Sequence, residues 1–194
     1  MESLTKKELL GLLKAARAAS ERDWLMILVG FWHGLRASEI CGGWRVRYVK
    51  KQKQKYLHPG LRACDVKDNF LTVARAKGSL KTTQELVKHP KPLLSEREAL
   101  IAFARKTYPT ARLFPIRRQH FWRLMRRYAK LAGIPAHKAH PHALKHTTAM
   151  LMIEKAGIQK TRQRLGHKSI ASTGKYLNET DANVDRVILK AVRL

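Results

Sequence analysis

The run at residues 24–32 (WLMILVGFW) is apolar nearly all the way round a helix. A helix without a polar face must lie inside a packed core, with other elements around it. Ser20 and Asp23 can begin this helix, and the turn at residues 34–36 (GLR) ends it. The run is far too short to span a bilayer, so we expect a soluble protein and no membrane partner.

Amphipathic patterns predict further helices on both sides of this run. Residues 4–19 (LTKKELLGLLKAARAA) begin with a capping box, Thr5 and Glu8, and place leucines at helical spacing. A second capping box, Ser95 and Glu98, predicts a helix that ends near residue 108. Further helices are expected at residues 37–41, 117–131, 141–157, 159–165, 169–176 and from about 181 onward.

Two segments read as short strands joined around Gly78: residues 70–78 (FLTVARAKG) and 83–94 (TQELVKHPKPLL). The chain has 194 residues, enough for one compact domain, and shows no internal repeat or low-complexity linker. We therefore expect a mainly α (α+β) fold, a single helical domain over residues 1–194 with a small antiparallel β-sheet.

The charge balance points to a polyanionic partner. Forty Lys and Arg stand against fourteen Asp and Glu, a formal net charge of +26. Residues 99–153 and 155–178 contain no acid. Such a field favours nucleic acid, since each neutralised phosphate releases a counterion. A solvated basic surface, as on a ribosomal protein, is the alternative. The two cysteines lack zinc-finger spacing, so we expect no metal and a reduced, cytoplasmic setting.

Three separated motifs carry candidate chemistry: residues 34–40 (GLRASEI), 140–146 (HPHALKH) and 164–177 (RLGHKSIASTGKYL). Each motif alone has a structural explanation. Arg36 could be a surface or capping residue, His142 and Lys145 share one helix face, and Tyr176 could be a packing residue. Their order and spacing together are far more specific than any one of them.

Taken jointly, the motifs resemble those of the tyrosine recombinases (phage integrase type), over almost the whole chain. That family has an Arg in G-L-R-x-S-E, a lysine in a β-hairpin, an H-x-L-R-H box, an L-G-H box and a tyrosine soon after it. The matching positions in this chain are Arg36, Lys77, His142, Lys145, His167 and Tyr176.

The resemblance implies DNA cleavage and rejoining through a 3′-phosphotyrosyl intermediate, with Tyr176 as the nucleophile. Fixed cations stabilise the negative charge that develops on the phosphate, and the planar fork of Arg36 can grip two oxygens. The candidate base is His142. The family assigns protonation of the departing 5′ oxygen to the hairpin lysine, here Lys77, or Lys81 if the register differs.

The remaining two roles are supporting ones. His167 is expected to hydrogen-bond the scissile phosphate, and Glu39 to orient its neighbours without reacting. No metal, nucleotide or other cofactor is implied.

Lys145 departs from the family pattern, which has an arginine there. Lysine keeps the charge but loses bidentate geometry. The chain is then either a working enzyme with slower chemistry or a DNA-binding protein of the same fold that cleaves poorly. A nicking-closing activity like that of type IB topoisomerases is a third alternative.

Two segments stand out from the family pattern. Residues 42–62 form a basic insertion, which we interpret as a loop that either contacts DNA or is merely solvated. Residues 178–194 form a tail helix whose apolar stripe suits docking into a neighbouring protomer of a tetramer on paired DNA sites, or onto its own core. We expect further contacts with double-stranded DNA from the basic residues Arg45, Arg47, Lys50, Lys51, Arg117, Arg118 and Arg123.

The chain begins where the family's catalytic domain begins. The resemblance therefore implies that the N-terminal core-binding domain is absent from residues 1–194, as in a fragment or in short standalone members such as the fimbrial phase-switch invertases. The family further implies a cytoplasmic, nucleoid-associated protein of prokaryotic, viral or mobile-element origin.

Overall fold

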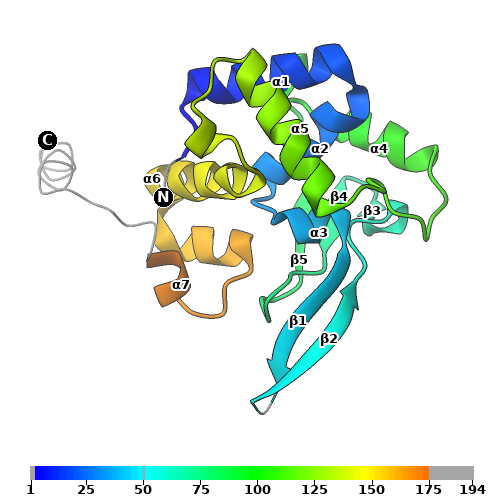
Figure 1. Ribbon diagram of the computed structural model, residues 1–194, viewed down its shortest axis with the longest axis vertical. Coiled ribbons are helices and arrows are strands. Elements are labelled where there is room, and N and C mark those ends of the chain that lie inside the picture. Colours follow the sequence, from blue (N-terminus) through cyan, green and yellow to red (C-terminus); the bar gives the residue numbers. More distant parts are fainter. Residues whose placement is uncertain (1–2, 50, 175–194) are drawn as a thin grey trace, which may run out of the picture.

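The computed structural model describes residues 3–49 and 51–174, without the side chains of residues 47–49. Helices cluster around one core, and a long two-stranded hairpin extends away from it (Figure 1). This architecture confirms the expected mainly α fold with small antiparallel sheets. Tyr176, Lys50, the Arg47 side chain and the predicted tail helix lie outside the described residues.

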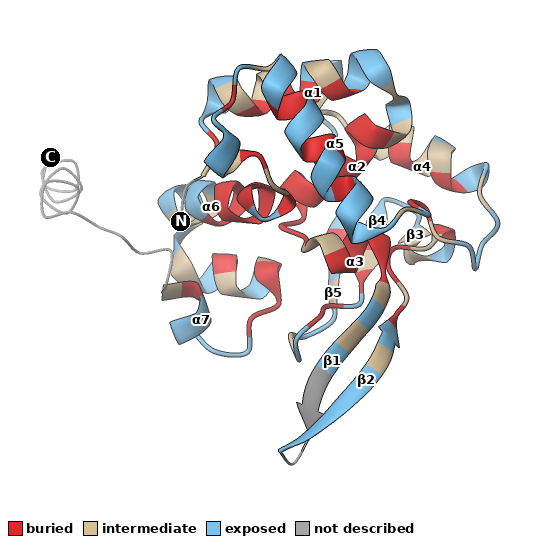
Figure 2. Cartoon of the chain, viewed as in Figure 1, coloured by how far each residue is buried: buried red, intermediate tan, exposed pale blue. Residues whose placement is uncertain are grey.

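The apolar run forms α2 (Glu21–Trp32), which is the centre of the core, as predicted. Its residues from Trp24 to Phe31 are all buried (Figure 2). The two tryptophans bring a polar group each: the Nε1 atoms of Trp24 and Trp32 donate to the carbonyls of Leu93 and Leu94, both at 2.9 Å. Both indole N–H groups therefore have hydrogen-bond acceptors inside the protein.

The other helices pack around α2. The first, α1 (Lys6–Ala19), has the predicted capping box at Thr5 and Glu8 and packs against α2 and α5 (Arg118–Leu131). The long α6 (Pro141–Leu165) also packs on α2 and is broken at Gly157, where φ is 78° and ψ is 169°. Shorter helices are α3 (Ala37–Cys41), α4 (Arg97–Arg105) and α7 (Ala171–Gly174). Short 3₁₀ helices cover Ala63–Asp65, Pro92–Leu94 and Ala136–Lys138.

A three-stranded antiparallel sheet contains β3 (Val66–Lys67), β4 (Phe70–Val73) and β5 (Thr82–Glu85), in that order. The register pairs Leu71 with Gln84 and Val73 with Thr82, so the connection between β4 and β5 carries Lys77. The second predicted strand was too long. It ends at Glu85, and the two prolines beyond it fall in irregular and 3₁₀ structure because proline cannot donate to a β-ladder.

The interpretation of residues 42–62 as a loop was wrong. Most of this segment is an antiparallel hairpin of β1 (Gly43–Val49) and β2 (Gln52–His58), with Trp44 opposite Leu57. Alternation of Trp44, Val46 and Tyr48 with arginines was a period-two strand signal that the density of positive charge obscured.

Gly42 and Gly60 fix the base of this hairpin. A Cβ on Gly60 would lie 2.7 Å from the Gly42 nitrogen, and both glycines have positive φ. The two ends of the hairpin therefore touch backbone to backbone.

The predicted second capping box was also wrong. The N-cap residue of α4 is Glu96, which makes no side-chain capping bond. Ser95 instead donates through Oγ to Glu98 and accepts from the His89 amide. The Glu96 carboxylate is engaged in the core, which moves the start of the helix.

Candidate active site

A cavity of about 400 Å³ brings together five of the six residues that the recombinase motifs single out. They come from four segments: the N-cap of α3, the β4–β5 connection, the first turns of α6 and the turn after α6. Its walls include Arg36, Lys77, His142, Lys145 and His167. The sixth residue, Tyr176, lies outside the described residues. Lys81 is exposed and is not among the lining residues.

Arg36 lines this cavity and is held from behind by the buried Glu39. Arg36 is the N-cap of α3, and its amide and Nη1 donate to the two carboxylate oxygens of Glu39 at 2.9 and 2.8 Å. The Ala76 amide also donates to Glu39, at 2.9 Å. One carboxylate therefore fixes the guanidinium of Arg36 and the backbone next to Lys77.

Glu39 is fully buried and ionised. Burial alone would raise the pKa of its carboxyl, but the charges of Arg75, Lys145 and Arg36 outweigh burial and lower the pKa to about 2. The carboxylate is therefore the negative centre of a group of cations.

Arg75 is a residue that the sequence analysis missed. Its side chain is wholly buried, and its five N–H groups meet five acceptors: Thr82 Oγ1, Gly34 O, Glu39 Oε2, His33 O and Arg164 O. With every donor in use, Arg75 cannot reach a phosphate. It ties the Arg36 turn, the β4–β5 connection and the end of α6 together.

A signal for Arg75 was present in the sequence. Leu71 and Val73 point into the core, and Arg75 follows them at the next inward position of the strand pattern. A charged residue at such a position indicates a buried ion pair, and the carboxylate in the GLRASEI motif was its available partner.

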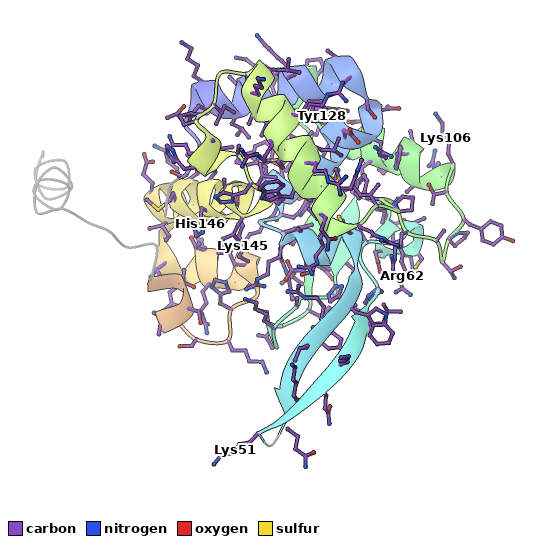
Figure 3. The ribbon with its side chains drawn as sticks, in the orientation of Figure 1. Lys51, Arg62, Lys106, Tyr128, Lys145 and His146 are labelled. Atoms are coloured by element: carbon purple, nitrogen blue, oxygen red, sulfur yellow. The ribbon has the colours of Figure 1, made fainter. Side chains whose placement is uncertain are left out.

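Lys145 is buried, with only 1% of its surface exposed, and it points from α6 into the interior (Figure 3). Its Nζ donates to the Gly34 carbonyl at 3.2 Å. Burial lowers the pKa of Lys145 to about 7; Arg36 and Arg75 act in the same direction, and Glu39 opposes them. Near neutral pH the ammonium is therefore protonated in only part of the molecules, unlike an arginine.

The two histidines of the site are neutral near pH 7. Burial, followed by the charges of Lys145 and Arg36, lowers the pKa of His142 below its usual value and that of His167 to about 4. His167 Nδ1 lies 2.9 Å from Thr173 Oγ1, which orients its ring. The His142 ring meets His146 edge to face at 4.3 Å. A neutral imidazole at His142 can accept a proton.

Lys77 lies at the mouth of the cavity. It is exposed and has a φ of 58°, followed by Gly78 at 70°, so the turn between β4 and β5 projects its side chain outward. It lines this cavity and a neighbouring hollow, as do Arg36 and His142.

That neighbouring hollow, of about 730 Å³, is bordered by β1, α5 and the start of α6. Arg45, Arg118 and Arg123 line it, and Arg117 lines a further hollow beside Arg123. Trp122, which the sequence analysis did not single out, adds an exposed aromatic ring with the Arg126 guanidinium 4.8 Å from its centre.

Lys51 lies apart from these hollows, at the hairpin tip (Figure 3). Within the described residues, no group of three or more His, Cys, Asp or Glu side chains could hold a metal ion. No helix in this part of the chain is long and apolar enough to cross a membrane.

Comparison with known proteins identifies the family and the fold. Residues 2–183 match the model of the phage integrase family. Tyrosine recombinase XerA of Pyrococcus furiosus is 28% identical over 200 residues, which cover 98% of this chain and 62% of that protein. The type 1 fimbriae regulatory protein FimB of Escherichia coli is also 28% identical, over 89% of this chain and 82% of its own length.

Solved structures share the fold. The crystal structure of XerA recombinase superposes with a TM-score of 0.69 at 21% identity, covering all of this chain and 64% of that one. A lambda integrase tetramer bound to a Holliday junction gives 0.65 at 19% identity, over 93% of this chain and 50% of its own. The chain spans less than two thirds of XerA and about half of the integrase. The family match extends over nearly all of its 194 residues, and the chain belongs to the phage integrase family, as its motifs predicted.

Proposed function

We propose that this chain is the catalytic part of a site-specific DNA recombinase that cuts and rejoins strands through Tyr176. The observation that carries the proposal is the convergence of Arg36, Lys77, His142, Lys145 and His167 on one cavity. These residues lie up to 131 positions apart in sequence. Their meeting provides the cations and the neutral base that phosphoryl transfer to a tyrosine needs.

The proposed step breaks one P–O bond and forms another. The Tyr176 oxygen attacks the scissile phosphate, and its proton passes to the neutral imidazole of His142. The bond to the 5′ oxygen breaks, and Lys77 supplies the proton that this oxygen takes. Attack by a 5′ hydroxyl of a partner strand reverses the step and rejoins the DNA.

The other residues that line the cavity have distinct tasks in this proposal. Arg36, held by Glu39, presents a fixed guanidinium to the non-bridging oxygens. His167 donates a hydrogen bond through the ring nitrogen opposite Thr173. Lys145 gains a partner when the phosphate enters, because the anion raises the pKa of the ammonium and favours uptake of a proton.

We propose double-stranded DNA as the substrate, bound across the hollow lined by Arg45, Arg118 and Arg123. A net charge of +26 supports a polyanionic partner. The basic hairpin would add contacts along the duplex from Arg47, Lys50 and Lys51, and α5 would add Arg117 at its N-terminus.

We further propose assembly as a tetramer on paired DNA sites, with residues 178–194 docking into a neighbouring protomer. The apolar stripe of that segment supports this, as does the assembly named for the lambda integrase relative. The proposed setting is the cytoplasm, at the nucleoid, with no cofactor.

A nicked suicide substrate tests the proposal, because loss of a short 5′ fragment traps the covalent intermediate. The unmodified chain is expected to form a DNA–protein adduct, and Tyr176→Phe to form none. Tyr108→Phe is the matched control, since Tyr108 is 80% exposed and far from the cavity; it should form adduct normally.

Tight DNA binding without an adduct from the unmodified chain would refute the enzyme proposal and leave a DNA-binding protein of the same fold. An adduct with rejoining confined to one duplex, without a tetramer, would indicate topoisomerase-like nicking and closing instead.

A further inference from the structure

His33 is a buried histidine that no step proposed above uses. It caps the C-terminal end of α2, directly before the turn that carries Arg36, and its side chain is completely inaccessible. Its Nδ1 lies 2.7 Å from Gln84 Oε1 in β5, and its Nε2 lies 2.8 Å from Glu96 Oε1 at the start of α4. Both ring nitrogens therefore face oxygen atoms.

The orientation of the Gln84 amide is fixed by its other contacts. Its Nε2 donates to the Arg164 carbonyl at 2.6 Å and to Thr82 Oγ1 at 3.2 Å. A backbone carbonyl can only accept, so the opposite orientation would place two acceptors 2.6 Å apart. Gln84 must turn its own oxygen toward His33, and His33 Nδ1 must carry the proton between them.

The second ring nitrogen faces a carboxylate. Glu96 Oε1 also accepts from the Val87 amide at 3.0 Å. With Nδ1 already protonated, a bare Nε2 would place a lone pair against that oxygen. A proton on Nε2 turns the contact into a charge-assisted hydrogen bond. We propose that His33 is a doubly protonated imidazolium paired with Glu96, and that it is a positioning residue for DNA strand cleavage.

Charged groups on the neighbouring elements both oppose and favour a second proton on His33. Arg164 Nη2 of α6 lies 3.4 Å from His33 Nδ1 and opposes the second proton, while Glu96 offsets both cations. Arg75, from the β4–β5 connection, donates a hydrogen bond to the backbone carbonyl of His33. The 2.7 Å contact with the Gln84 oxygen is much shorter than the Arg164 contact, so it places a proton on Nδ1, and the second proton depends on Glu96.

The ring connects three parts of the site. His33 directly precedes Gly34, whose carbonyl accepts a hydrogen bond from Lys145. Gln84, held by the ring, donates to the Arg164 carbonyl, as does Arg75. That carbonyl lies three residues before His167 in the chain. Removing the Nδ1 proton places two acceptors in contact at Gln84, and removing the Nε2 proton does so at Glu96. Either change displaces the ring, so Gln84 shifts and its bond to the segment that carries His167 is weakened.

Nitrogen NMR on the ¹⁵N-labelled full chain tests the protonation state without any DNA. Both His33 nitrogens should show directly bonded protons and protonated chemical shifts. His33→Gln identifies the signals by their loss. A single protonated nitrogen would overturn the proposal.

Single-turnover cleavage of the suicide substrate tests the positioning role, which rests on the proposed function. Glu96→Gln should lower the cleavage rate at least about tenfold, with DNA affinity changed less than about twofold, because the ring orients catalytic groups and does not touch DNA. Glu98→Gln is the matched control, since that carboxylate is exposed and lies two residues away; its rate should not change.

The outcomes separate the two proposals. Failure of the unmodified chain to cleave counts against the proposed function, whereas the NMR result stands independently. Cleavage by the unmodified chain with an undiminished rate for Glu96→Gln would overturn the positioning role. Equal losses of rate and affinity would overturn it too, since they indicate general unfolding.

Discussion

Replacing Glu39 by glutamine should remove most of the order in the cavity. The carboxylate accepts hydrogen bonds from Arg36, Arg75 and the Ala76 amide, and its charge also acts on Lys145. Glutamine has almost the same shape but no charge, and its NH₂ group must face donors. The change therefore removes the charge and some of the hydrogen bonds while keeping the volume of the side chain nearly the same.

The magnitude follows from the pKa of Glu39. Folding lowers this pKa from 4.5 to about 2, and at about 1.36 kcal/mol per pKa unit this corresponds to about 3 kcal/mol at pH 7. Because the pKa falls on folding, this stability is complete above pH 4.5 and is lost as the pH falls toward 2. About 1 kcal/mol of it remains at pH 3. The group is fully buried, so solvent screening does not reduce these values.

Urea unfolding at pH 7 and pH 3 measures the effect. Glu39→Gln should lower the free energy of unfolding by about 3 to 5 kcal/mol at pH 7, the range for breaking a buried ion pair. The difference from the unmodified chain should shrink by roughly 2 kcal/mol at pH 3. Glu98→Gln, on the exposed face of α4, is the control and should change little at either pH.

Two results would refute this reasoning. A loss below about 1 kcal/mol at pH 7 would mean that the carboxylate does not stabilise the cations. An equal loss at both pH values would mean that the effect comes from shape and not from charge.

Three further changes probe other parts of the molecule. Lys145→Arg should raise the single-turnover cleavage rate about tenfold, because arginine stays protonated and can grip two oxygens; a slower variant would show that the cavity is adapted to lysine. Gly34→Ala should lower the melting temperature more than Gly133→Ala: both glycines have positive φ, but only at Gly34 would a methyl group overlap another side chain, that of Leu165. Equal losses would leave backbone strain as the whole cause. Changing three hairpin lysines to glutamine should make the slope of log K against log salt for DNA binding shallower by up to about 2.7, whereas the same change to three lysines of α1 should leave it unaltered; an unchanged slope for the hairpin set would exclude the hairpin from the DNA interface. The hairpin set is Lys51, Lys53 and Lys55, and the α1 set is Lys6, Lys7 and Lys14.

Local patterns predicted the helices well because each signal lies within a few neighbouring residues. The capping box at Thr5 and the all-round apolar run both gave the correct elements. The Ser95 box failed because its neighbour Glu96 is committed to a contact with His33, which lies 63 positions away. Propensity gives way where a distant partner uses the same side chain.

The sequence predicted which residues meet in the cavity, but not how deeply they are buried or which hydrogen bonds hold them. The motifs named the five residues that meet in one cavity, because their order in the chain is specific. Burial of Lys145 and the network around Arg75 depend on packing between segments far apart in sequence. Only the fold brings those segments together, so a single sequence could not assign either feature.

The paired glycines at the base of the β1–β2 hairpin make that hairpin structurally independent of the rest of the fold. The chain leaves the body at Gly42 and returns at Gly60 through the same narrow gap, and the Leu61 amide closes the gap by donating to the Ile40 carbonyl at 3.1 Å. A hairpin of different length or sequence could therefore be exchanged there without moving α3 or the cavity. The length and sequence of the hairpin can therefore vary at this junction, while the residues that line the cavity keep their places.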